Sequence, residues 1–413
     1  MNIKLFDFEK NIFPVNTEID KKIAMQKKER INDATDVEIN DKYKNMSSRI
    51  ITESGSIKLD LLNQYIDNKK YILKPDFQRR KVWNNKKRSR LIESFIMNIP
   101  VPPVFLYETE FDEYEVMDGL QRLSAISDFF KDKFQLEGLE SWNELNGKQY
   151  SDLPEIIKKS IERRQISLIT LLKETTNDKE IEEKIKKTVF ERLNTGGEKL
   201  RAQEIRNALF QGKFNDLCLK LSKNEIFKKL WGIKDEIIDE AEDEFTDDEK
   251  PENNFTRHMD DVEIVLRFFA MRNINNFNIS LSAFLDSYLK FANKLKENQV
   301  AKLEEKFISS IQKVYNLFGE KSFCKYTKKD DAWVWEKPQR MIYDPIMLAV
   351  DDFDILPEHH KIEKNIKILE KKYIENENKS EPINFSGKAQ SKKEIEKRTL
   401  FFIDVIETII KGC

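Results

Sequence analysis

The chain has 413 residues, which is enough for two domains or for one domain with a large extension. Charged residues make up 35% of it, but they nearly balance, and the formal net charge of −2 excludes a uniformly basic nucleic-acid-binding protein. The three cysteines are far apart, which excludes a disulfide framework and a zinc knuckle and indicates a reducing, cytoplasmic location. The most apolar stretches, residues 99–107 and 400–410, are short and interrupted by prolines or charges, so we expect no membrane span.

The first half of the chain predicts a small mixed α/β domain. Residues 1–55 show mixed charge and little apolar periodicity, and we expect them to form a solvated or partly ordered N-terminal arm. Residues 56–212 then alternate between helical and strand-like apolar patterns. The clearest predicted elements are a helix at 86–98, which prolines end, and strands at 104–107, 114–117 and 165–172.

The second half predicts a helical domain over residues 213–413. Five segments have one apolar face at helical spacing, namely 257–271, 282–294, 300–318, 360–373 and 392–410. The acidic segment 235–252 precedes them and is expected to be a mobile loop. The fold class is therefore α+β, with a mixed α/β domain followed by a mainly α-helical one.

The most informative feature is the junction between the strand at 114–117 and the helix that follows it. A carboxylate, a glycine, an amide and a guanidinium fall together at this turn, in Asp118, Gly119, Gln121 and Arg122. The first turn of a helix has unpaired N–H groups and a dipole that favours anions. Asp118 alone would be explained as a helix cap. A cap does not explain Gln121 and Arg122 beside it, so the junction predicts an anion site.

Two further clusters combine arginine with an amide side chain near a helix end or a turn. One contains Gln78 and Arg79, and the other contains Arg192 and Asn194. Arginine can bind phosphate oxygens in a bidentate manner, and an amide can bind a base or a ribose. Asp118 could hold a Mg²⁺ that bridges phosphates. Each cluster alone is explained by surface ion pairs and caps, but their recurrence favours a phosphate-binding site.

Between residues 57 and 211, five motifs occur in a recognisable order. They are Phe77-Gln78-Arg79 with Trp83, Leu91-Ile92-Glu93-Ser94, Ile99-Pro100-x-Pro102-Pro103, Asp118-Gly119-x-Gln121-Arg122-Leu123 and Phe190-x-Arg192-Leu193-Asn194-x-Gly196-Gly197. This order resembles the N-terminal domain of GmrSD-type restriction endonucleases, which is related to the ParB nucleotide-binding fold. The family signature Asp-Gly-Gln-Gln-Arg falls on residues 118–122, with Leu120 in place of the first glutamine. Residues 257–268 also resemble the helical region that follows this domain in family members.

The resemblance implies binding and hydrolysis of a nucleoside triphosphate with Mg²⁺, in defence against foreign and often modified DNA. Its implied catalytic residues are Asp118, which is also the metal ligand, Gln121 and Arg122. Its implied nucleotide-binding residues are Gln78, Arg79, Gly119, Arg192 and Asn194.

Many relatives also carry a nuclease domain of the His-Asn-His type. The only histidines of this chain are His258, His359 and His360, and none is followed by the pattern that such a site requires. His258 falls on a predicted helix, and we expect it to be a surface residue rather than a catalytic one. We therefore expect DNA cleavage to come from a partner nuclease subunit. The alternative is a non-enzymatic DNA-binding or regulatory module of the same fold.

Overall fold

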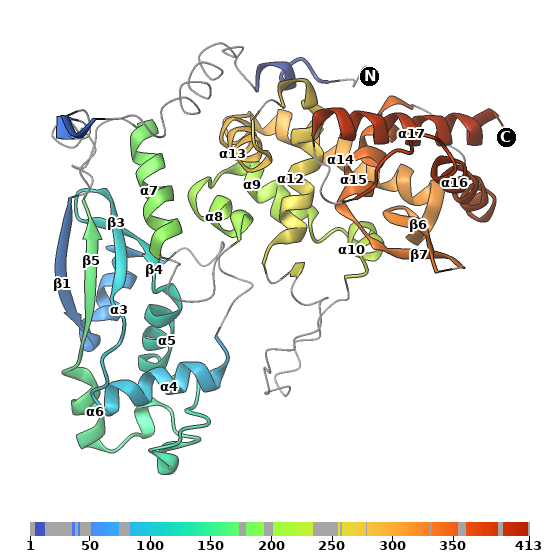
Figure 1. The fold of residues 1–413 in the computed structure, drawn as a ribbon. Helices are drawn as coiled ribbons and strands as arrows, with labels where there is room; N and C mark the ends of the chain where they lie inside the picture. Colours follow the sequence, from blue (N-terminus) through green and yellow to red (C-terminus); the bar gives the residue numbers. More distant parts are fainter. Residues whose placement is uncertain are drawn as a thin grey trace. The chain divides into compact units, whose positions relative to one another are not determined.

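The computed structural model describes residues 5–12, 35–37, 40–41, 51–73, 83–172, 179–193, 201–233, 255–256, 258–277, 279–330, 332–353, 361–386 and 391–411. The chain divides into two compact units (Figure 1). The α/β unit comprises Glu18–Ile205, and the helical unit comprises Met1–Thr17 together with Arg206–Cys413. A five-stranded sheet in the first unit and a mainly helical second unit confirm the predicted fold class.

The α/β unit is built on one mixed sheet with the strand order β1-β5-β3-β4-β2. Its strands are β1 (Thr52–Lys58), β2 (Tyr71–Ile72), β3 (Val104–Glu110), β4 (Glu113–Asp118) and β5 (Gln165–Leu171). The neighbours β5/β3 and β4/β2 are parallel, whereas β1/β5 and β3/β4 are antiparallel. Alternate side chains of β3, β4 and β5 enter the core, which places the residues between them on the opposite face.

Four helices share the core on one face of the sheet. They are α3 (Leu59–Asp67), α4 (Asn85–Ile96), α5 (Leu120–Phe130) and α6 (Glu155–Glu162). Helix α4 begins where the Asn84 side chain accepts a hydrogen bond from the backbone N–H of Lys87, at 2.9 Å. Its apolar residues Leu91, Ile92 and Phe95 are buried, as the predicted helix at 86–98 requires. The predicted strands correspond to β3, β4 and β5.

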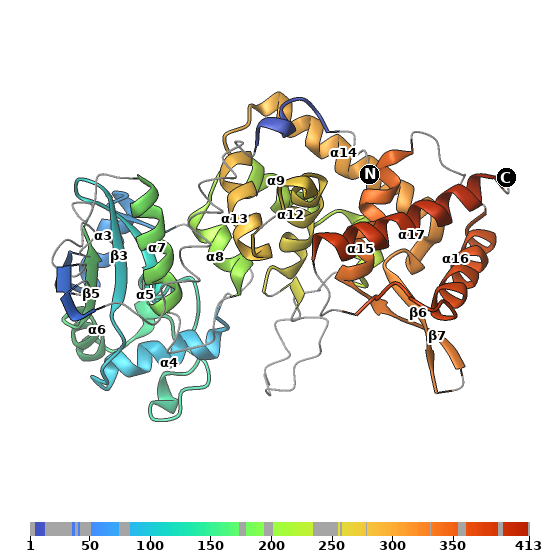
Figure 2. The same ribbon diagram turned by 45° about the horizontal axis from the view of Figure 1, so that its top comes forward.

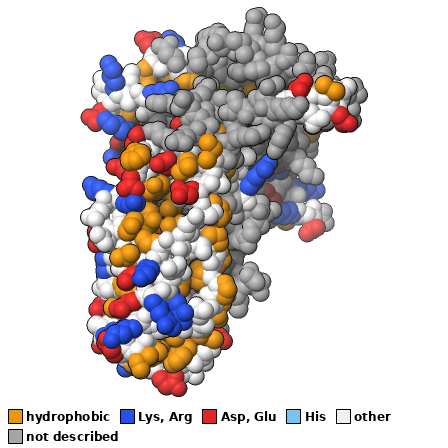
Figure 3. Space-filling model, turned by 90° about the vertical axis from the view of Figure 1, so that its left-hand side faces the viewer, with side chains coloured by type: hydrophobic (Ala, Val, Ile, Leu, Met, Phe, Trp, Pro, Cys, Tyr) orange, Lys and Arg blue, Asp and Glu red, His pale blue; other side chains and the backbone are white. Residues whose placement is uncertain are grey.

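Helix α7 (Lys179–Leu193) packs on the other face of the sheet. The Tyr107 hydroxyl of β3 donates to Glu182 Oε1 at 2.5 Å, and the Lys186 ammonium lies 3.6 Å from the Tyr107 ring centroid. Burial and the hydrogen bond to Glu182 both raise the pKa of Tyr107. On the side of the unit at which β1 lies, hydrophobic side chains gather between charged side chains of both signs (Figure 3).

The helical unit forms around α12 (Asp260–Arg272), from which 12 residues are buried. The same hydrophobic core includes residues of α9 (Lys213–Leu221), α10 (Glu225–Trp231), α13 (Leu281–Ala292), α14 (Glu297–Phe318), α15 (Arg340–Ala349), α16 (Ile362–Glu377) and α17 (Lys392–Lys411). The short helix α8 (Ala202–Leu209) spans the boundary between the units. Shorter turns are η1 (Glu9–Asn11), η6 (Ile274–Asn276), η7 (Gly319–Lys321) and η8 (Val350–Asp352), while η3 (Asn143–Leu145) and η4 (Tyr150–Asp152) belong to the α/β unit.

The structure corrects three expectations. A hairpin of β6 (Cys324–Lys329) and β7 (Ala332–Pro338) interrupts the helical half, which the sequence predicts to be almost entirely helical. Glu9 belongs to a buried ion pair with Arg272 rather than to a solvated arm. His258, expected at the surface, is buried.

Several predicted features lie outside the described residues. They include the acidic segment 235–252, His359 and His360. Among the described residues, no helix combines the length and the apolar character needed to cross a bilayer.

Candidate functional site

The junction between β4 and α5 depends on a single glycine. Gly119 follows the last residue of β4 and has a left-handed backbone with φ of 94°. A Cβ atom at this position would lie 2.8 Å from Cγ2 of Val104 on the neighbouring strand β3. Both the backbone angle and the close approach require glycine, so Gly119 sets the direction in which α5 leaves the sheet.

Arg122 and Asp118 form an ion pair across this turn. Nη2 of Arg122 donates to Oδ2 of Asp118 at 2.6 Å, while Nη1 donates to the carbonyl oxygens of Pro102 and Pro103 at 2.6 and 3.2 Å. The Arg122 side chain is 11% exposed and that of Asp118 is 40% exposed. Arg122 is therefore a positioning residue that fixes Asp118, whose carboxylate remains partly open to solvent.

The N-terminus of α5 carries no side-chain cap. Its N-cap residue is Gly119, and Asp118 bonds to Arg122 instead of to a backbone N–H group. The first N–H groups of a helix have no partner inside the helix. The junction thus presents uncapped N–H donors beside a carboxylate, an arrangement suited to an anion that also carries a metal ion.

Gln121 adds a polar side chain to the same turn. Its Oε1 accepts a hydrogen bond from the backbone N–H of Trp83 at 3.2 Å. The amide nitrogen makes no hydrogen bond to any residue that the structure describes, so it can donate to a ligand. Trp83 follows the cluster that contains Gln78 and Arg79, and its ring lies 5.1 Å from the Lys87 ammonium.

Arg192 belongs to the last turn of α7 and is exposed. Figures 1 and 2 show α7 running along the sheet toward the end at which β4 passes into α5. The structure thereby brings the end of α7 to the same end of the sheet as Asp118. The other predicted ligands, Gln78, Arg79 and Asn194, lie outside the described residues.

The polar residues that follow Arg192 and Asn194 along the chain, in α8, have structural roles. Arg206 is buried, and it pairs with Glu263 at 2.9 Å and with Asp286 at 2.7 Å. The Asn207 side chain accepts a hydrogen bond from the Asn215 amide at 2.6 Å. All of these partners belong to the helical unit.

The donor set at Asp118 fits one kind of metal site. The described part of the chain contains no group of three or more His, Cys, Asp or Glu side chains that could hold a metal ion. Asp118 has one carboxylate oxygen bonded to Arg122 and a second that makes no hydrogen bond to a described residue. This suits a Mg²⁺ that takes one carboxylate and completes its shell with phosphate oxygens and water.

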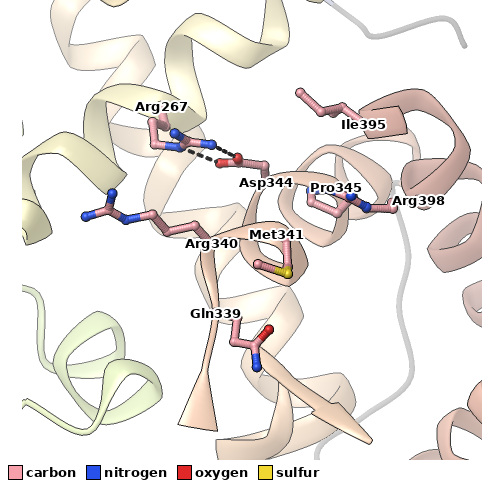
Figure 4. Close-up of a pocket in the computed structure, with 8 residues that line it drawn as sticks. All are labelled: Arg267, Gln339, Arg340, Met341, Asp344, Pro345, Ile395 and Arg398. Carbon is pink, nitrogen blue, oxygen red and sulfur yellow. Dashed lines mark hydrogen bonds and ion pairs between the residues drawn. The ribbon is translucent and has the colours of Figure 1, made fainter. Parts of the chain in front are cut away.

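The helical unit contains a second candidate site, a cavity of about 280 Å³ (Figure 4). It is lined by Arg267, Gln339, Arg340, Met341, Asp344, Pro345, Ile395 and Arg398. Protein oxygens already engage its guanidinium groups, since Arg267 pairs with Asp344, Arg340 pairs with Asp260 at 2.9 Å, and Arg398 donates to the Asn384 carbonyl at 2.7 Å. The junction at Asp118 is the better candidate because its carboxylate is partly exposed beside uncapped donors.

Comparison with protein families identifies the α/β unit. Residues 59–211 match the family described as GmrSD restriction endonuclease, N-terminal domain. The α/β unit contains a GmrSD N-terminal domain. The match includes every described site residue, namely Asp118, Gly119, Gln121, Arg122 and Arg192, and it ends before most of the helical unit. Comparisons with curated proteins and with solved structures gave no match.

The GmrSD domain uses two contacts that the sequence does not reveal. The prolines at 102 and 103 predict the end of a helix, but their carbonyl oxygens also hold Arg122. Proline keeps its carbonyl acceptor although it lacks an N–H group. The second contact, between Trp83 and Gln121, joins residues 38 positions apart through a backbone N–H, and no side-chain pattern signals it.

Proposed function

We propose that the GmrSD domain of this chain binds a nucleoside triphosphate with Mg²⁺ at the N-terminus of α5 and hydrolyses it. This activity would serve a restriction or phage-defence system that acts on foreign or modified DNA. The observation that carries the proposal is the uncapped first turn of α5, with a partly exposed Asp118 fixed beside it by Arg122.

Each residue of the site has a separate role in this proposal. Phosphate oxygens accept hydrogen bonds from the first N–H groups of α5, and Gln121 donates its amide nitrogen. Asp118 holds the Mg²⁺ or orients the attacking water, and Arg122 keeps its carboxylate in place. Arg192 and the three undescribed residues Gln78, Arg79 and Asn194 supply the remaining charge and polar contacts. When bound, Mg²⁺ neutralises charge on the phosphates.

One observation favours the alternative, a DNA-binding or regulatory module without turnover. The Arg122 guanidinium already donates to three protein oxygens, which leaves fewer of its N–H groups for the terminal phosphate that turnover would require it to bind. Such a module would bind DNA but would release no phosphate from any nucleoside triphosphate. A phosphate-release assay with and without DNA separates the two functions.

Binding itself is tested by thermal unfolding with each of the four nucleoside triphosphates, with and without Mg²⁺. A ligand that binds only the folded state, at about 100 times its dissociation constant, stabilises that state by roughly 2.7 kcal/mol. Arg122→Ala should abolish the thermal shift because Asp118 loses its partner. Lys131→Ala is the matched control, since Lys131 pairs with Asp67 at 2.7 Å outside the site. If no triphosphate raises the melting temperature of the unmodified chain, the nucleotide proposal is wrong.

The proposal also assigns DNA cleavage to a partner nuclease subunit. The purified chain alone should then leave plasmid DNA intact whichever divalent metal is added. Nicking by the unmodified chain that disappears in Asp118→Ala would instead place cleavage in the GmrSD domain.

A further inference from the structure

The β6–β7 hairpin projects from the helical unit beside α16 (Figures 1 and 2). Trp335 attaches it to that helix, since its indole N–H donates to Glu370 Oε1 at 3.1 Å and its ring meets Tyr373 edge-on at 6.4 Å. The hairpin is therefore a fixed element of the unit, and its outer part extends beyond this attachment.

A row of aromatic rings runs outward along the hairpin. The ring centroid of Tyr326 lies 4.9 Å from that of Trp335 and 5.3 Å from that of Trp333, with which it stacks at an interplanar angle of 24°. Trp333 is partly exposed, and its indole N–H makes no hydrogen bond to a residue that the structure describes. Trp335 thus attaches the hairpin, whereas Trp333, at the outer end of the row, has no such attachment.

Lysines accompany these rings on both strands. Lys328 lies directly opposite Trp333 in the antiparallel register, and Lys325 and Lys337 flank the irregularity nearer the base. None of the three forms an ion pair with a described residue, whereas Lys329 pairs with Glu336 at 2.9 Å. The hairpin itself, residues 324–338, contains four basic and three acidic residues. Its basic character therefore rests on the three lysines that have no ion-pair partner among the described residues.

We propose that this hairpin binds a DNA strand, with Lys325, Lys328 and Lys337 on backbone phosphates and Trp333 stacked on an unpaired base. Lysines supply sequence-independent affinity for phosphates, and aromatic rings stack on bases of any sequence. The choice of DNA as the partner rests on the proposed function, but the basic and aromatic surface is independent of the nucleotide site.

Charge and apolar area favour DNA over a protein partner. The large hydrophobic side chain that is most exposed on the hairpin is Val334, at 36%, which is too little for the apolar centre of a protein interface. Asp330, which directly follows β6, would repel phosphates. We therefore place the stacked base on the face that carries Trp333 and Lys328. Lys325 follows the alternation of β6 to the opposite face, so it would reach a phosphate around the edge of the hairpin.

The test is fluorescence anisotropy with a labelled single strand of about 15 nucleotides, the upper range for one binding module. The full chain is titrated without nucleotide between about 50 and 200 mM salt. Simultaneous Lys325→Ala, Lys328→Ala and Lys337→Ala should lower the slope of log affinity against log salt by about 2, because each lost phosphate contact on a single strand contributes about 0.7. The control replaces three exposed lysines elsewhere in the same unit, Lys223, Lys294 and Lys302, and should retain the slope.

Trp333 is tested with a pair of variants. Trp333→Ala should weaken single-strand binding roughly 5- to 150-fold, the loss expected for one base–aromatic stack, while Trp333→Phe should retain most of the affinity. Equal salt slopes in the two triple-lysine variants would overturn the proposal. Unchanged affinity in Trp333→Ala, or equal binding of the complementary duplex, would overturn the stacking role.

The nucleotide experiment has a separate outcome. Hairpin variants should keep any thermal shift produced by a triphosphate, because the residues proposed to bind it belong to the GmrSD domain. Loss of DNA binding with that shift intact therefore tests the hairpin alone.

Discussion

The two units use the same chemical pair, arginine with a carboxylate, in opposite environments. At the GmrSD site, Asp118 is 40% exposed and pairs with Arg122 at the surface end of α5. In the helical unit, Arg267 and Asp344 are almost completely buried. Burial alone would lower the pKa of Arg267, but Asp344, together with Glu263 and Tyr343, more than compensates, so the pKa is raised. Exposure, rather than the chemistry of the ion pair, distinguishes a pair that can bind a ligand from a pair that only stabilises the fold.

A second buried network extends this contrast. Arg272 donates to Glu9 at 2.9 and 3.0 Å and also pairs with Asp351, which in turn pairs with Lys306. The four charges balance, and Arg272, Glu9 and Asp351 are fully buried. Removing one member of such a network leaves an uncompensated charge without water around it.

The largest effect is expected for Arg272→Ala. It leaves two buried carboxylates with one cation, and we expect a loss of about 3–5 kcal/mol in the free energy of unfolding of the helical unit. Chemical denaturation at neutral pH measures the loss. Lys213→Ala, which breaks an exposed pair with Glu297, should leave the free energy of unfolding almost unchanged. Equal losses in the free energy of unfolding for the two variants would contradict the different roles assigned to buried and exposed ion pairs.

Arg122→Ala should have an intermediate effect on stability. The variant loses hydrogen bonds between a charged group and three oxygens, for which we expect about 1.5–3 kcal/mol. Chemical denaturation of the two variants in parallel makes the comparison. A loss as large as that of Arg272→Ala would mean that Arg122 also serves mainly to hold the fold.

Asp118→Asn should have a small effect on stability and a large one on binding. The partly exposed ion pair becomes a hydrogen bond from the charged Arg122 guanidinium to a neutral amide oxygen, a change that we expect to cost less than about 1 kcal/mol. Because an amide is a poor Mg²⁺ ligand, the part of the thermal shift that requires Mg²⁺ should disappear. An Asp118→Asn protein that keeps this part would show that the metal binds elsewhere.

The smallest effect is expected on the hairpin, where Glu336 pairs with an exposed lysine. The hydrogen bond from Lys329 lowers the pKa of Glu336 from 4.5, although burial by itself would raise this pKa. A lowered pKa means that the stabilisation is complete above the ordinary value and is lost as the pH falls through the folded value. NMR titration of the Glu336 carboxyl should give a midpoint below 4.5, and Lys329→Ala should raise that midpoint.

Much of the GmrSD domain follows from its sequence because local patterns and tertiary packing agree there. Alternating residues in β3 and β4, and the prolines after α4, mark elements that the core then buries. The sequence does not predict strand β1, because nearly all of its residues are exposed and polar. Only its pairing with β5 defines it. The sequence does not predict the β6–β7 hairpin either, because lysines separate its aromatic residues, and this spacing resembles the solvated face of a helix.

The candidate site is likewise predictable from the sequence only in part. Asp118, Gly119, Gln121 and Arg122 are adjacent in sequence, so a strand–helix pattern is enough to place them together. The acceptors for Arg122 come from Pro102 and Pro103, on a segment that the sheet brings back beside α5. Backbone carbonyls carry no residue-type signal, and only the folded chain reveals them.

The buried contact between Glu9 and Arg272 also constrains the order of folding during synthesis. The described core of the GmrSD domain is complete once residue 193 has left the ribosome. The helical unit still lacks Arg272 and Asp351 at that point, so Glu9 has no counter-charge to bury itself against. At about 5–20 residues per second, Asp351 follows roughly 8–30 s later. The segment around Glu9 is therefore expected to fold after the GmrSD domain, although it is synthesised first.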